Sequence, residues 1–435
     1  MKKIKTVTVI GATGTMGANV SGIFASFGNA KVYCVGRDIE KVKKTIPKIV
    51  KSVRADSIRE NLIPADFSML KQCVSESNLV FESLVEDISV KKEIASEVNK
   101  YLPSDSISCT GSSGLSIEEI AECYSDEKRK LFFGVHMFNP PYNMTLCELI
   151  STDYADENVK SELKDYLKNQ LFRTVVEVKN APAFLGNRIG FQFINEALQY
   201  AEKYKDNGGI DYIDAILGPF TGRAMPPLLT ADFVGLDVHK AIVDNIYSNT
   251  EDYARDTFLL PDFASDLIDS KQLGRKTGAG LYKTIYYDNG VKRHTVFDIR
   301  TGCYRDIKKY VFPFADSMKE SISNGDYTSA FNQLITNNSI EAQICLSFIM
   351  KYIVYSLYSA QQIGYTLEAA DDVMATGFNW CPPISLYCAL SNVVDVPQLI
   401  KERFSDLWNA VDIISLTENI KTSKYDYRKY FKSGR

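Results

Sequence analysis

The chain has 435 residues, of which 45% are hydrophobic and 24% are charged, and its formal net charge is −4. This length exceeds one ordinary domain and allows two or three, each with a core of its own. Because a nucleic-acid-binding protein normally presents a strongly basic surface, the near balance of charges argues against nucleic acid as a partner. No apolar run approaches the roughly 20 residues needed to cross a bilayer, so no membrane partner is expected.

Nine cysteines are scattered along the chain without the C-x-x-C spacing of metal or redox motifs. Such usage is typical of a reducing compartment in which most thiols are buried. The N-terminal residues run directly into a strand-like segment and do not have the pattern of a signal peptide. We therefore predict a cytoplasmic protein without a metal site.

The first 150 residues alternate short apolar runs with helical stretches. The runs lie at residues 7–10, 32–35, 79–81, 107–109 and 131–135. This alternation is typical of βαβ units whose parallel sheet is buried on both faces. The predicted fold class is therefore α/β, with a doubly wound domain at the N-terminus.

Beyond residue 182 the pattern changes to long helices, such as the one expected over residues 187–204. The pair Asn289-Gly290, between strand-like residues, predicts the two-residue turn of a hairpin in a small β-ribbon. We predict an N-terminal domain over residues 1–181, a mainly α-helical domain over 182–283, a ribbon and linker over 284–335, and a second helical part with a basic tail over 336–435.

The last segment repeats the order of features found in the helical domain. In the first copy a long helix and an acidic stretch lead to Pro226-Pro227, and in the second they lead to Pro382-Pro383. The recurrence of helix, acidic helix start, glycine and double proline indicates a duplicated helical domain. If one copy covers the apolar face of the other, a monomer becomes plausible, and a homodimer is the alternative.

A glycine-rich loop follows the first predicted strand. It contains Gly11, Gly14 and Gly17 in a G-x-x-G-x-x-G pattern, and a helix pattern begins inside it at Thr15 and Met16. Glycines let backbone N–H groups and the start of the helix approach a pyrophosphate. A loop in this position predicts a Rossmann-type dinucleotide-binding domain.

The end of the second predicted strand bears on the choice of nucleotide. Gly36 and Arg37 stand where a NAD-specific site carries an acidic residue for the ribose. A missing carboxylate removes repulsion against a 2′-phosphate, and a guanidinium can bind that phosphate through two hydrogen bonds. The sequence therefore favours NADP over NAD. In the alternative interpretation Arg37 is a solvated surface residue, and Asp38 or a water serves the ribose of NAD.

A histidine and a glutamate form a candidate catalytic pair. His136 follows the strand-like run at residues 131–135, and a residue at the carboxyl end of a parallel strand faces the crevice where ligands bind. Glu148 lies in the next apolar run, where a carboxylate needs a partner such as an imidazole. By spacing alone, two unrelated residues are as plausible as a pair.

The chain resembles the 3-hydroxyacyl-CoA dehydrogenase family in five motifs that occur in the family's order. They are a serine loop at residues 110–115, a histidine segment at 134–140, a glutamate segment at 146–149, an asparagine segment at 186–191 and a signature at 274–282. The ribbon and the second helical part are similar to those of the longer, fatty-acid-oxidation type, without its hydratase domain. The resemblance implies a 3-hydroxyacyl-CoA dehydrogenase or 3-oxoacyl-CoA reductase that takes an acyl-CoA substrate and NADP or NAD.

The resemblance also implies a catalytic set of Ser113, His136, Glu148 and Asn187. In this set His136 is the base for the hydroxyl proton, and Glu148 orients and stabilises its imidazole. Ser113 and Asn187 hydrogen-bond the reacting oxygen. Ser112 is the rival of Ser113, which we favour because it aligns with the family's loop without a gap.

Three further residues, Glu86, Lys91 and Asn139, are implied by the resemblance as contacts to the nicotinamide half of the cofactor. For Glu86 and Lys91 a solvated helix face is the alternative. The chain departs from the family in its glycine loop, which has G-x-x-G-x-x-G spacing in place of G-x-G-x-x-G, and at Gly36, which replaces the ribose carboxylate. Both departures concern the cofactor site and put the preference for NAD in doubt.

Two other functions stay open at this point. One is a dehydrogenase of a free hydroxy acid, gulonate- or carnitine-like, and the other is a non-catalytic binding protein on the same fold. The complete catalytic set argues against the second. His239 and His294 are expected in packing or surface roles, and the tail at residues 421–435 is expected to be solvated and mobile, with attraction of CoA phosphates as its alternative.

Overall fold

The computed structural model describes residues 3–286 and 292–432, and the chain divides into two compact units. The first unit comprises Met1–Phe184 and Ile363–Tyr365, and the second comprises Leu185–Gln362 and Thr366–Arg435. The predicted turn at Asn289-Gly290 lies outside the described residues.

The first unit is built on an eight-stranded sheet with the strand order β3-β2-β1-β4-β5-β6-β7-β8. Neighbouring strands are parallel except for the antiparallel pair β6 and β7. The prediction of a doubly wound α/β domain is confirmed. The strands are β1 (Thr6–Ile10), β2 (Lys31–Gly36), β3 (Leu62–Asp66), β4 (Leu79–Glu82), β5 (Ile107–Thr110), β6 (Phe132–Met137), β7 (Leu146–Ser151) and β8 (Thr174–Val178).

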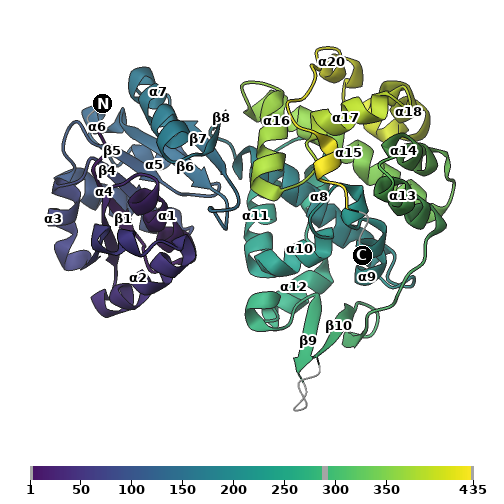
Figure 1. The fold of residues 1–435 in the computed structure, drawn as a ribbon, viewed down its shortest axis with the longest axis horizontal. Coiled ribbons are helices and arrows are strands. Elements are labelled where there is room, and N and C mark those ends of the chain that lie inside the picture. The colour runs from purple at the N-terminus through teal and green to yellow at the C-terminus, as the bar shows by residue number, and fades with distance from the viewer. Residues whose placement is uncertain (1–2, 287–291, 433–435) are drawn as a thin grey trace. The chain divides into compact units, whose positions relative to one another are not determined.

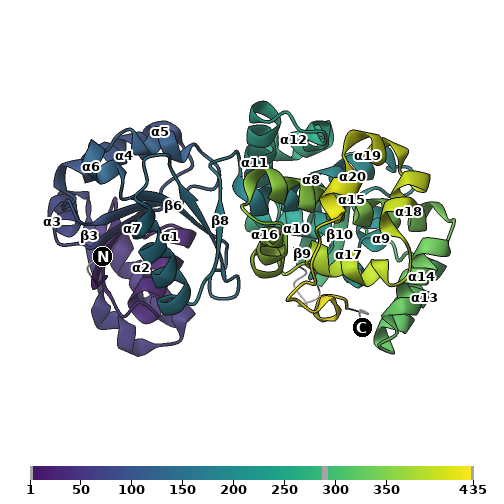
Figure 2. The ribbon, with the colours of Figure 1, turned by 90° about the horizontal axis from the view of Figure 1, so that it is seen from above.

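Helices cover both faces of this sheet, which explains why its central strands are continuous apolar runs. One face carries α1 (Thr15–Ser26), α2 (Ile39–Val53) and α7 (Glu157–Asp165), and the other carries α4 (Ile88–Tyr101), α5 (Ile117–Ala121) and α6 (Asp126–Arg129) (Figure 2). A short helix, α3 (Leu70–Ser75), precedes β4. The apolar residues of β1 are fully buried among these helices.

The two strands that the sequence patterns do not indicate are the edge strands β3 and β8. β3 contains Pro64, which lacks a backbone N–H and is tolerated in a sheet at an edge. β8 mixes buried and half-buried positions, so its sequence lacks the continuous apolar run of an inner strand.

The second unit is mainly helical, with a three-stranded ribbon in the order β11-β10-β9. Figure 1 shows α15 running through the body of helices in this unit. The elements before the ribbon are α8 (Phe184–Lys203), α9 (Ile210–Ile216), α10 (Pro227–Val234), α11 (Leu236–Asn249) and α12 (Asp262–Asp269). The ribbon strands are β9 (Tyr282–Tyr286), β10 (Lys292–Asp298) and β11 (Cys303–Asp306). The helices after the ribbon are α13 (Pro313–Ser323), α14 (Tyr327–Thr336), α15 (Ile340–Ile363), α16 (Glu368–Val373), α17 (Pro383–Ser391), α18 (Val396–Arg403), α19 (Ser405–Ala410) and α20 (Ile413–Thr417).

The stretch expected to be a linker after the ribbon contains two helices, α13 and α14, in place of irregular chain. Pro313 stands in the first turn of α13, where its missing N–H costs nothing. The buried residues Phe314, Met318 and Ile322 recur at a spacing of four and form one apolar face. This helical spacing is present in the sequence, although our domain assignment did not use it.

Helix α15 has the length and composition of a membrane span, with a mean hydropathy of 1.3, whereas the sequence reading found no such run. Within the structure 72% of its most apolar window is buried. Apolar residues around the whole circumference of a helix are expected when other helices surround it. Its composition is therefore that of a core helix of this unit.

A recurring contact supports the predicted duplication. The buried carboxylate of Asp214, on α9, accepts hydrogen bonds from the N–H groups of Leu228 and Leu229 at 2.8 and 3.0 Å, at the start of α10. Asp371, on α16, accepts one from the N–H of Ile384 at 2.7 Å, at the start of α17. Each aspartate thus supplies an acceptor to the free N–H groups of the helix that begins with the double proline.

The C-terminal tail contacts the helices of the second unit at several residues, whereas its basic residues Lys421, Lys424, Arg428, Lys429 and Lys432 are exposed. The hydroxyl groups of Ser423 and Tyr425 donate to the carboxylates of Asp371 and Asp372 on α16. Phe431 is buried and packs edge-to-face against Phe331 on α14. These contacts give the tail enough buried partners to offset the entropy of ordering it.

Candidate active site

A cavity of about 600 Å³ opens in the first unit at the carboxyl ends of β1, β2 and β4. Ligands bind at this edge in open α/β sheets, at the point where the strand order reverses. The cavity is lined by Gly11, Thr13, Gly14, Thr15, Met16, Gly36, Arg37, Phe67, Ser83, Leu84, Val85, Glu86, Val90, Gly111 and Ser113. The lining therefore joins the glycine loop, the end of β2 and the serine loop in one space.

The glycine loop is packed too closely for side chains at two of its positions. Gly11 has φ +92°, and a Cβ there would collide with the carbonyl oxygen of Ser83. A Cβ on Gly17 would collide with the carbonyl oxygen of Gly11. Gly14 caps α1 without any side-chain hydrogen bond, so the first N–H groups of the helix remain available to an anion. The residues present fit the pyrophosphate of a dinucleotide.

Position 36 has no room for the acidic side chain that would bind a ribose. A Cβ on Gly36 would lie 2.7 Å from Val42 Cγ2 and 3.0 Å from Thr13 Cγ2. Thr13 is one of the two residues that separate Gly11 from Gly14, so the longer spacing of the loop and the missing carboxylate at position 36 lie side by side. Asp38 caps α2 and accepts hydrogen bonds from the N–H groups of Glu40 and Lys41. Arg37 is exposed and lines the cavity.

His136 and Glu148 are partners across two strands. They face each other in the antiparallel register of β6 and β7, and Nδ1 of His136 lies 2.7 Å from Oε2 of Glu148. His136 is 5% exposed and Glu148 is fully buried. A carboxylate can only accept, so this bond places the proton on Nδ1 and leaves the Nε2 lone pair free to act as a base.

Two aromatic rings pack against the imidazole of His136. The ring centroids of Phe138 and Phe184 lie 4.5 and 5.7 Å from that of His136. Both phenylalanines are buried, so they exclude water around the pair. Exclusion of water strengthens the interaction between a carboxylate and an imidazolium.

The two serines of the loop after β5 have different roles. The hydroxyl of Ser112 is buried and donates to Oε1 of Glu86 at 2.6 Å. Ser113 donates its backbone N–H to the same oxygen at 2.7 Å, and the residue lines the cavity. The Ser112 hydroxyl is engaged inside the loop, whereas Ser113 faces the space where a ligand fits.

The remaining predicted residues lie in separate places. Lys91 is 1% exposed and is bonded to Glu82, so it is neither solvated nor part of the cavity lining. Asn139 is exposed after β6, with its Oδ1 3.4 Å from Nδ2 of Asn19 on α1. Asn187 is buried near the start of α8, in the second unit. Its part in the catalytic set stays a prediction.

Comparison with known proteins decides which family these features represent. Residues 6–181 match the model of the 3-hydroxyacyl-CoA dehydrogenase NAD binding domain, and residues 184–284 match the model of the C-terminal domain of the same family. The chain belongs to the 3-hydroxyacyl-CoA dehydrogenase family. The resemblance stated from its five motifs is thereby confirmed, and the first unit contains the family's NAD-binding domain.

Members of the family align over different parts of the chain. The rat mitochondrial hydroxyacyl-coenzyme A dehydrogenase is 30% identical over 294 residues, which cover 64% of this chain and 91% of that protein. A probable 3-hydroxyacyl-CoA dehydrogenase of Bacillus subtilis is 26% identical over 406 residues, or 87% of this chain. The alignment covers 50% of that relative, so this chain spans about half the length of the Bacillus protein.

Solved structures extend the likeness to the second helical part. The crystal structure of 3-hydroxybutyryl-CoA dehydrogenase from Escherichia coli matches with a TM-score of 0.70 and 20% identity, and the match covers 95% of this chain and 98% of that chain. The (S)-3-hydroxybutyryl-CoA dehydrogenase from Ralstonia eutropha matches with a TM-score of 0.56 and 25% identity, covering 64% of this chain and 98% of that one. The fold of the whole chain is thus one that occurs among 3-hydroxybutyryl-CoA dehydrogenases.

Sequence reasoning missed several residues of this 3-hydroxyacyl-CoA dehydrogenase-type site. Thr13 and Phe67 line the cavity. Glu82 accepts a hydrogen bond from the hydroxyl of Thr110, at the start of the serine loop. Glu82 could have been noticed, because it ends a buried apolar strand in the same way that Glu148 lies within one. Phe67 and Thr110 have no signal of their own, since only the folded sheet places them beside the loop.

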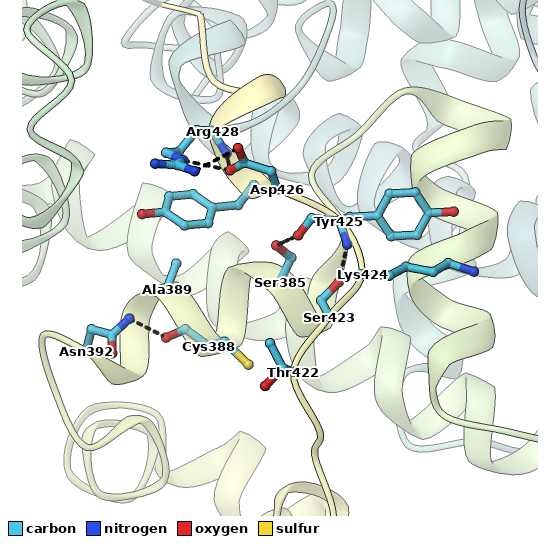
Figure 3. A pocket seen from close by; sticks show the side chains of 11 residues that line it. Ser385, Cys388, Ala389, Asn392, Thr422, Ser423, Lys424, Tyr425, Asp426 and Arg428 are labelled. Atoms are coloured by element: carbon cyan, nitrogen blue, oxygen red, sulfur yellow. Dashed lines mark hydrogen bonds and ion pairs between the residues drawn. The ribbon is translucent and has the colours of Figure 1, made fainter.

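A second cavity, of about 470 Å³, lies in the helical unit between α17 and the tail (Figure 3). Two basic residues stand at its edge, but Arg428 pairs with Asp426 at 2.8 Å and Lys424 pairs with Asp372 at 2.8 Å. Their charges are therefore matched inside the protein. Ser385 donates to the carbonyl of Tyr425, so that its hydroxyl helps to hold the tail.

Proposed function

We propose that the protein transfers a hydride between C3 of an acyl-CoA and a nicotinamide dinucleotide, as a 3-hydroxyacyl-CoA dehydrogenase or 3-oxoacyl-CoA reductase. The observation that carries this proposal is the buried His136–Glu148 pair with its free Nε2. Oxidation of a secondary alcohol needs a base for the hydroxyl proton, and histidine is the side chain suited to that task near neutral pH.

In the oxidation, Nε2 of His136 takes the hydroxyl proton as the C3–H bond breaks and the C–O bond becomes a carbonyl. A nicotinamide dinucleotide held at the glycine loop would supply the hydride acceptor. Glu148 stabilises the imidazolium that forms, because its carboxylate already holds the Nδ1 proton. In the reduction His136 returns the proton to the carbonyl oxygen while the hydride moves the other way.

Ser113 and Asn187 are proposed as hydrogen-bond donors to the reacting oxygen, which carries partial negative charge in the transition state. Two contacts support Ser113. The residue lines the cavity, and the Glu86 carboxylate holds its backbone N–H. Glu86 also lines the cavity, which supports a position beside the nicotinamide half, and Asn139 is proposed for the same region from the family resemblance.

For the cofactor we propose NADP, with NAD as the alternative. Three observations support this choice: Gly36 has no space for a carboxylate, Asp38 is engaged in capping α2, and Arg37 lines the cavity. A planar guanidinium can bind a 2′-phosphate with two parallel hydrogen bonds. An NADP-linked enzyme would favour the reductive direction.

We propose a cytoplasmic location, supported by nine cysteines that all stay free. The substrate partner is an acyl-CoA of unspecified chain length.

The test is a spectrophotometric assay at 340 nm with acetoacetyl-CoA, run with NADPH and NADH on the wild type, H136A and E148Q. We expect turnover with preference for NADPH, a loss of about 10²–10⁴-fold in kcat for H136A, and a loss of about 10²-fold or more for E148Q with little change in KM. Glu177→Gln on β8 is the matched control, because Glu177 is a strand glutamate that pairs with surface lysines.

Three outcomes would each contradict part of the proposal. Full activity of H136A would remove histidine as the base. Turnover with a gulonate- or carnitine-like hydroxy acid and none with acyl-CoA would reject the thioester substrate while leaving the hydride chemistry in place. Equal or faster turnover with NADH would reject the role of Arg37.

A further inference from the structure

A buried lysine lies between two carboxylates under the serine loop. Lys91, on α4, is 1% exposed, and its Nζ lies 2.9 and 3.0 Å from the two carboxylate oxygens of Glu82. The same Nζ is 3.5 Å from Oε2 of Glu86. A buried ammonium is costly unless its charge and its three donors are matched. Both glutamates therefore serve to hold Lys91, and Lys91 in turn neutralises part of their charge.

Glu82 is also bonded to the last residue of β5, and Glu86 is bonded to the loop that follows this strand. Oε2 of Glu82 accepts from the hydroxyl of Thr110 at 2.6 Å. Oε1 of Glu86 accepts from the hydroxyl of Ser112 at 2.6 Å and from the N–H of Ser113 at 2.7 Å. The serine loop is thus attached at three points to two carboxylates that share one cation.

These bonds determine how Ser113 is presented. Glu86 holds the N–H of Ser113, which constrains the backbone at this residue, and Ser113 lines the cavity. Ser112 reinforces this arrangement, because its buried hydroxyl also accepts from the N–H of Leu115 at 3.1 Å. The loop offers one hydroxyl to the cavity and uses the other to hold its own shape.

We propose that Lys91 is a positioning residue for Ser113, acting through Glu86 and Glu82. The inference rests on the proposed function, in which Ser113 hydrogen-bonds the reacting oxygen. It differs from the direct contact of Lys91 with the nicotinamide half that the family resemblance implies, and the two roles predict different effects on the nucleotide KM. Nζ of Lys91 holds the two carboxylates in place by its contacts with both, and hydrogen bonds to a charged acceptor are about twice as strong as those to a neutral one.

Loss of the lysine would leave two neighbouring carboxylates without the cation between them. The two carboxylates would then repel each other and move apart, which weakens the bonds from Glu86 to Ser112 and Ser113. A displacement of about 1 Å of a group that contacts the transition state can cost on the order of 10²-fold in rate. The expected effect is therefore on kcat, because substrate and nucleotide contacts elsewhere are unchanged.

The experiment is a double-mutant cycle with wild type, K91M, S113A and K91M/S113A, in which kcat and KM for nucleotide and acyl-CoA are measured for each protein. We expect K91M to lower kcat about 10- to 100-fold and to change the nucleotide KM less than about threefold. In the S113A background K91M should change kcat less than about threefold, because the hydroxyl that Lys91 positions is already absent.

K92M is the matched control. Lys92 is the next residue on α4, is partly exposed, and pairs with Glu119 at the surface, so its loss changes the charge of the same helix without touching the loop. A kcat for K92M within about twofold of wild type is expected.

Because K91M leaves a buried charge unpaired, folding is checked by circular dichroism, and S112A provides a second route. S112A removes one bond to Glu86 without unpairing a charge. It should lower kcat about 3- to 10-fold in the wild-type background and leave kcat nearly unchanged in S113A.

The outcomes separate this inference from the function on which it rests. If the wild type shows no turnover, the proposed function fails and the inference falls with it. If S113A retains full activity, the proposed function stands, but the role of Ser113 is rejected and the positioning role of Lys91 is rejected with it. If S113A loses activity but K91M lowers kcat by the same factor in both backgrounds, only the positioning role is rejected. A raised nucleotide KM with unchanged kcat in K91M would instead show direct contact with the cofactor.

Discussion

At the scale of single residues, the environment of a histidine decides whether it can take up a proton. His136 keeps one nitrogen free beside a carboxylate, whereas His239 is fully buried in the helical unit. Nε2 of His239 lies 2.9 Å from Oδ1 of Asn195, and Asn195 donates its amide hydrogens to the carbonyls of Thr257 and Leu259. Since Oδ1 is the acceptor, Nε2 of His239 carries the proton. Its Nδ1 has no hydrogen-bond partner among the residues that the structure describes.

His239 should make the protein less stable in acid. Burial lowers the pKa of His239 to about 3. Between pH 6.5 and pH 3 the histidine is therefore protonated in the unfolded chain and neutral in the folded chain. The stabilisation is complete above pH 6.5 and is lost as the pH falls toward 3. One pKa unit corresponds to about 1.4 kcal/mol, so about 2 kcal/mol is lost by pH 5. Relative to wild type, H239Q should therefore gain about 2 kcal/mol in unfolding free energy between pH 7.5 and pH 5.

Urea unfolding at the two pH values measures this gain. His294→Gln, at an exposed position on β10, is the control and should follow the wild type. If the difference between H239Q and wild type does not change with pH, His239 is not held neutral by burial.

At the scale of secondary-structure elements, buried aspartates connect helices to their neighbours. Asp214 accepts from two N–H groups of α10 and from the hydroxyl of Tyr282 on β9 at 2.7 Å. Asp371 joins α16 to α17 and to the tail through Ile384 and Ser423. Burial raises the pKa of Asp214 to about 7 and that of Asp371 to about 6, although the hydrogen bonds act in the opposite direction. Each aspartate thus joins neighbouring elements by hydrogen bonds, while its burial disfavours the ionised carboxylate.

Asp214 should make the helical unit less stable as the pH rises. Its folded-state pKa lies above the ordinary value of 3.8, so its contribution is complete below pH 3.8 and is lost as the pH rises through 7. Between pH 5 and pH 8 this loss is roughly 3 kcal/mol. D214N cannot ionise, so we expect its unfolding free energy to approach that of the wild type, or pass it, over this interval.

The measurement is again the urea midpoint, with the exposed Asp244→Asn on α11 as the control. A growing disadvantage of D214N at high pH would mean that the two N–H groups and the tyrosine stabilise the carboxylate more than burial opposes it. That result would show that burial does not raise the pKa of Asp214.

At the scale of the whole molecule, the second helical part covers an apolar face of the first. Phe193, on α8, packs edge-to-face against Phe348 on α15 and against Trp380, with ring centroids 5.1 and 5.4 Å away. The buried guanidinium of Arg223 lies between the two parts, 3.7 Å from the ring centroid of Phe193 and 4.8 Å from that of Trp380. The chain thus supplies from within itself a partner for the apolar face of α8.

We therefore expect a monomer in solution. An exposed apolar face of this kind would favour a second subunit, and its cover by α15 removes that driving force. Light scattering at micromolar concentration should give a molar mass near 48.9 kDa. A mass near twice that value across a tenfold dilution would show that another surface forms a homodimer.

The sequence by itself determined the fold class and the family, because both depend on patterns that are read along the chain. Apolar runs at strand spacing, the glycine loop with Gly11, Gly14 and Gly17, and five motifs in order were sufficient. It also singled out His136 and Glu148, although their spacing could not show that they meet. Their catalytic roles, like those of Ser113 and Asn187, stay predictions.

Only the tertiary structure decided which residues face one another. The antiparallel register of β6 and β7 places His136 opposite Glu148, and a shift of one residue would turn one of them to the other face of the sheet. Likewise Lys91, Glu82 and Glu86 meet under the serine loop because β4, α4 and β5 pack together, which no local pattern records. Such pairings arise from long-range contacts whose free energy depends on burial and distance, and these exist only once the chain has folded.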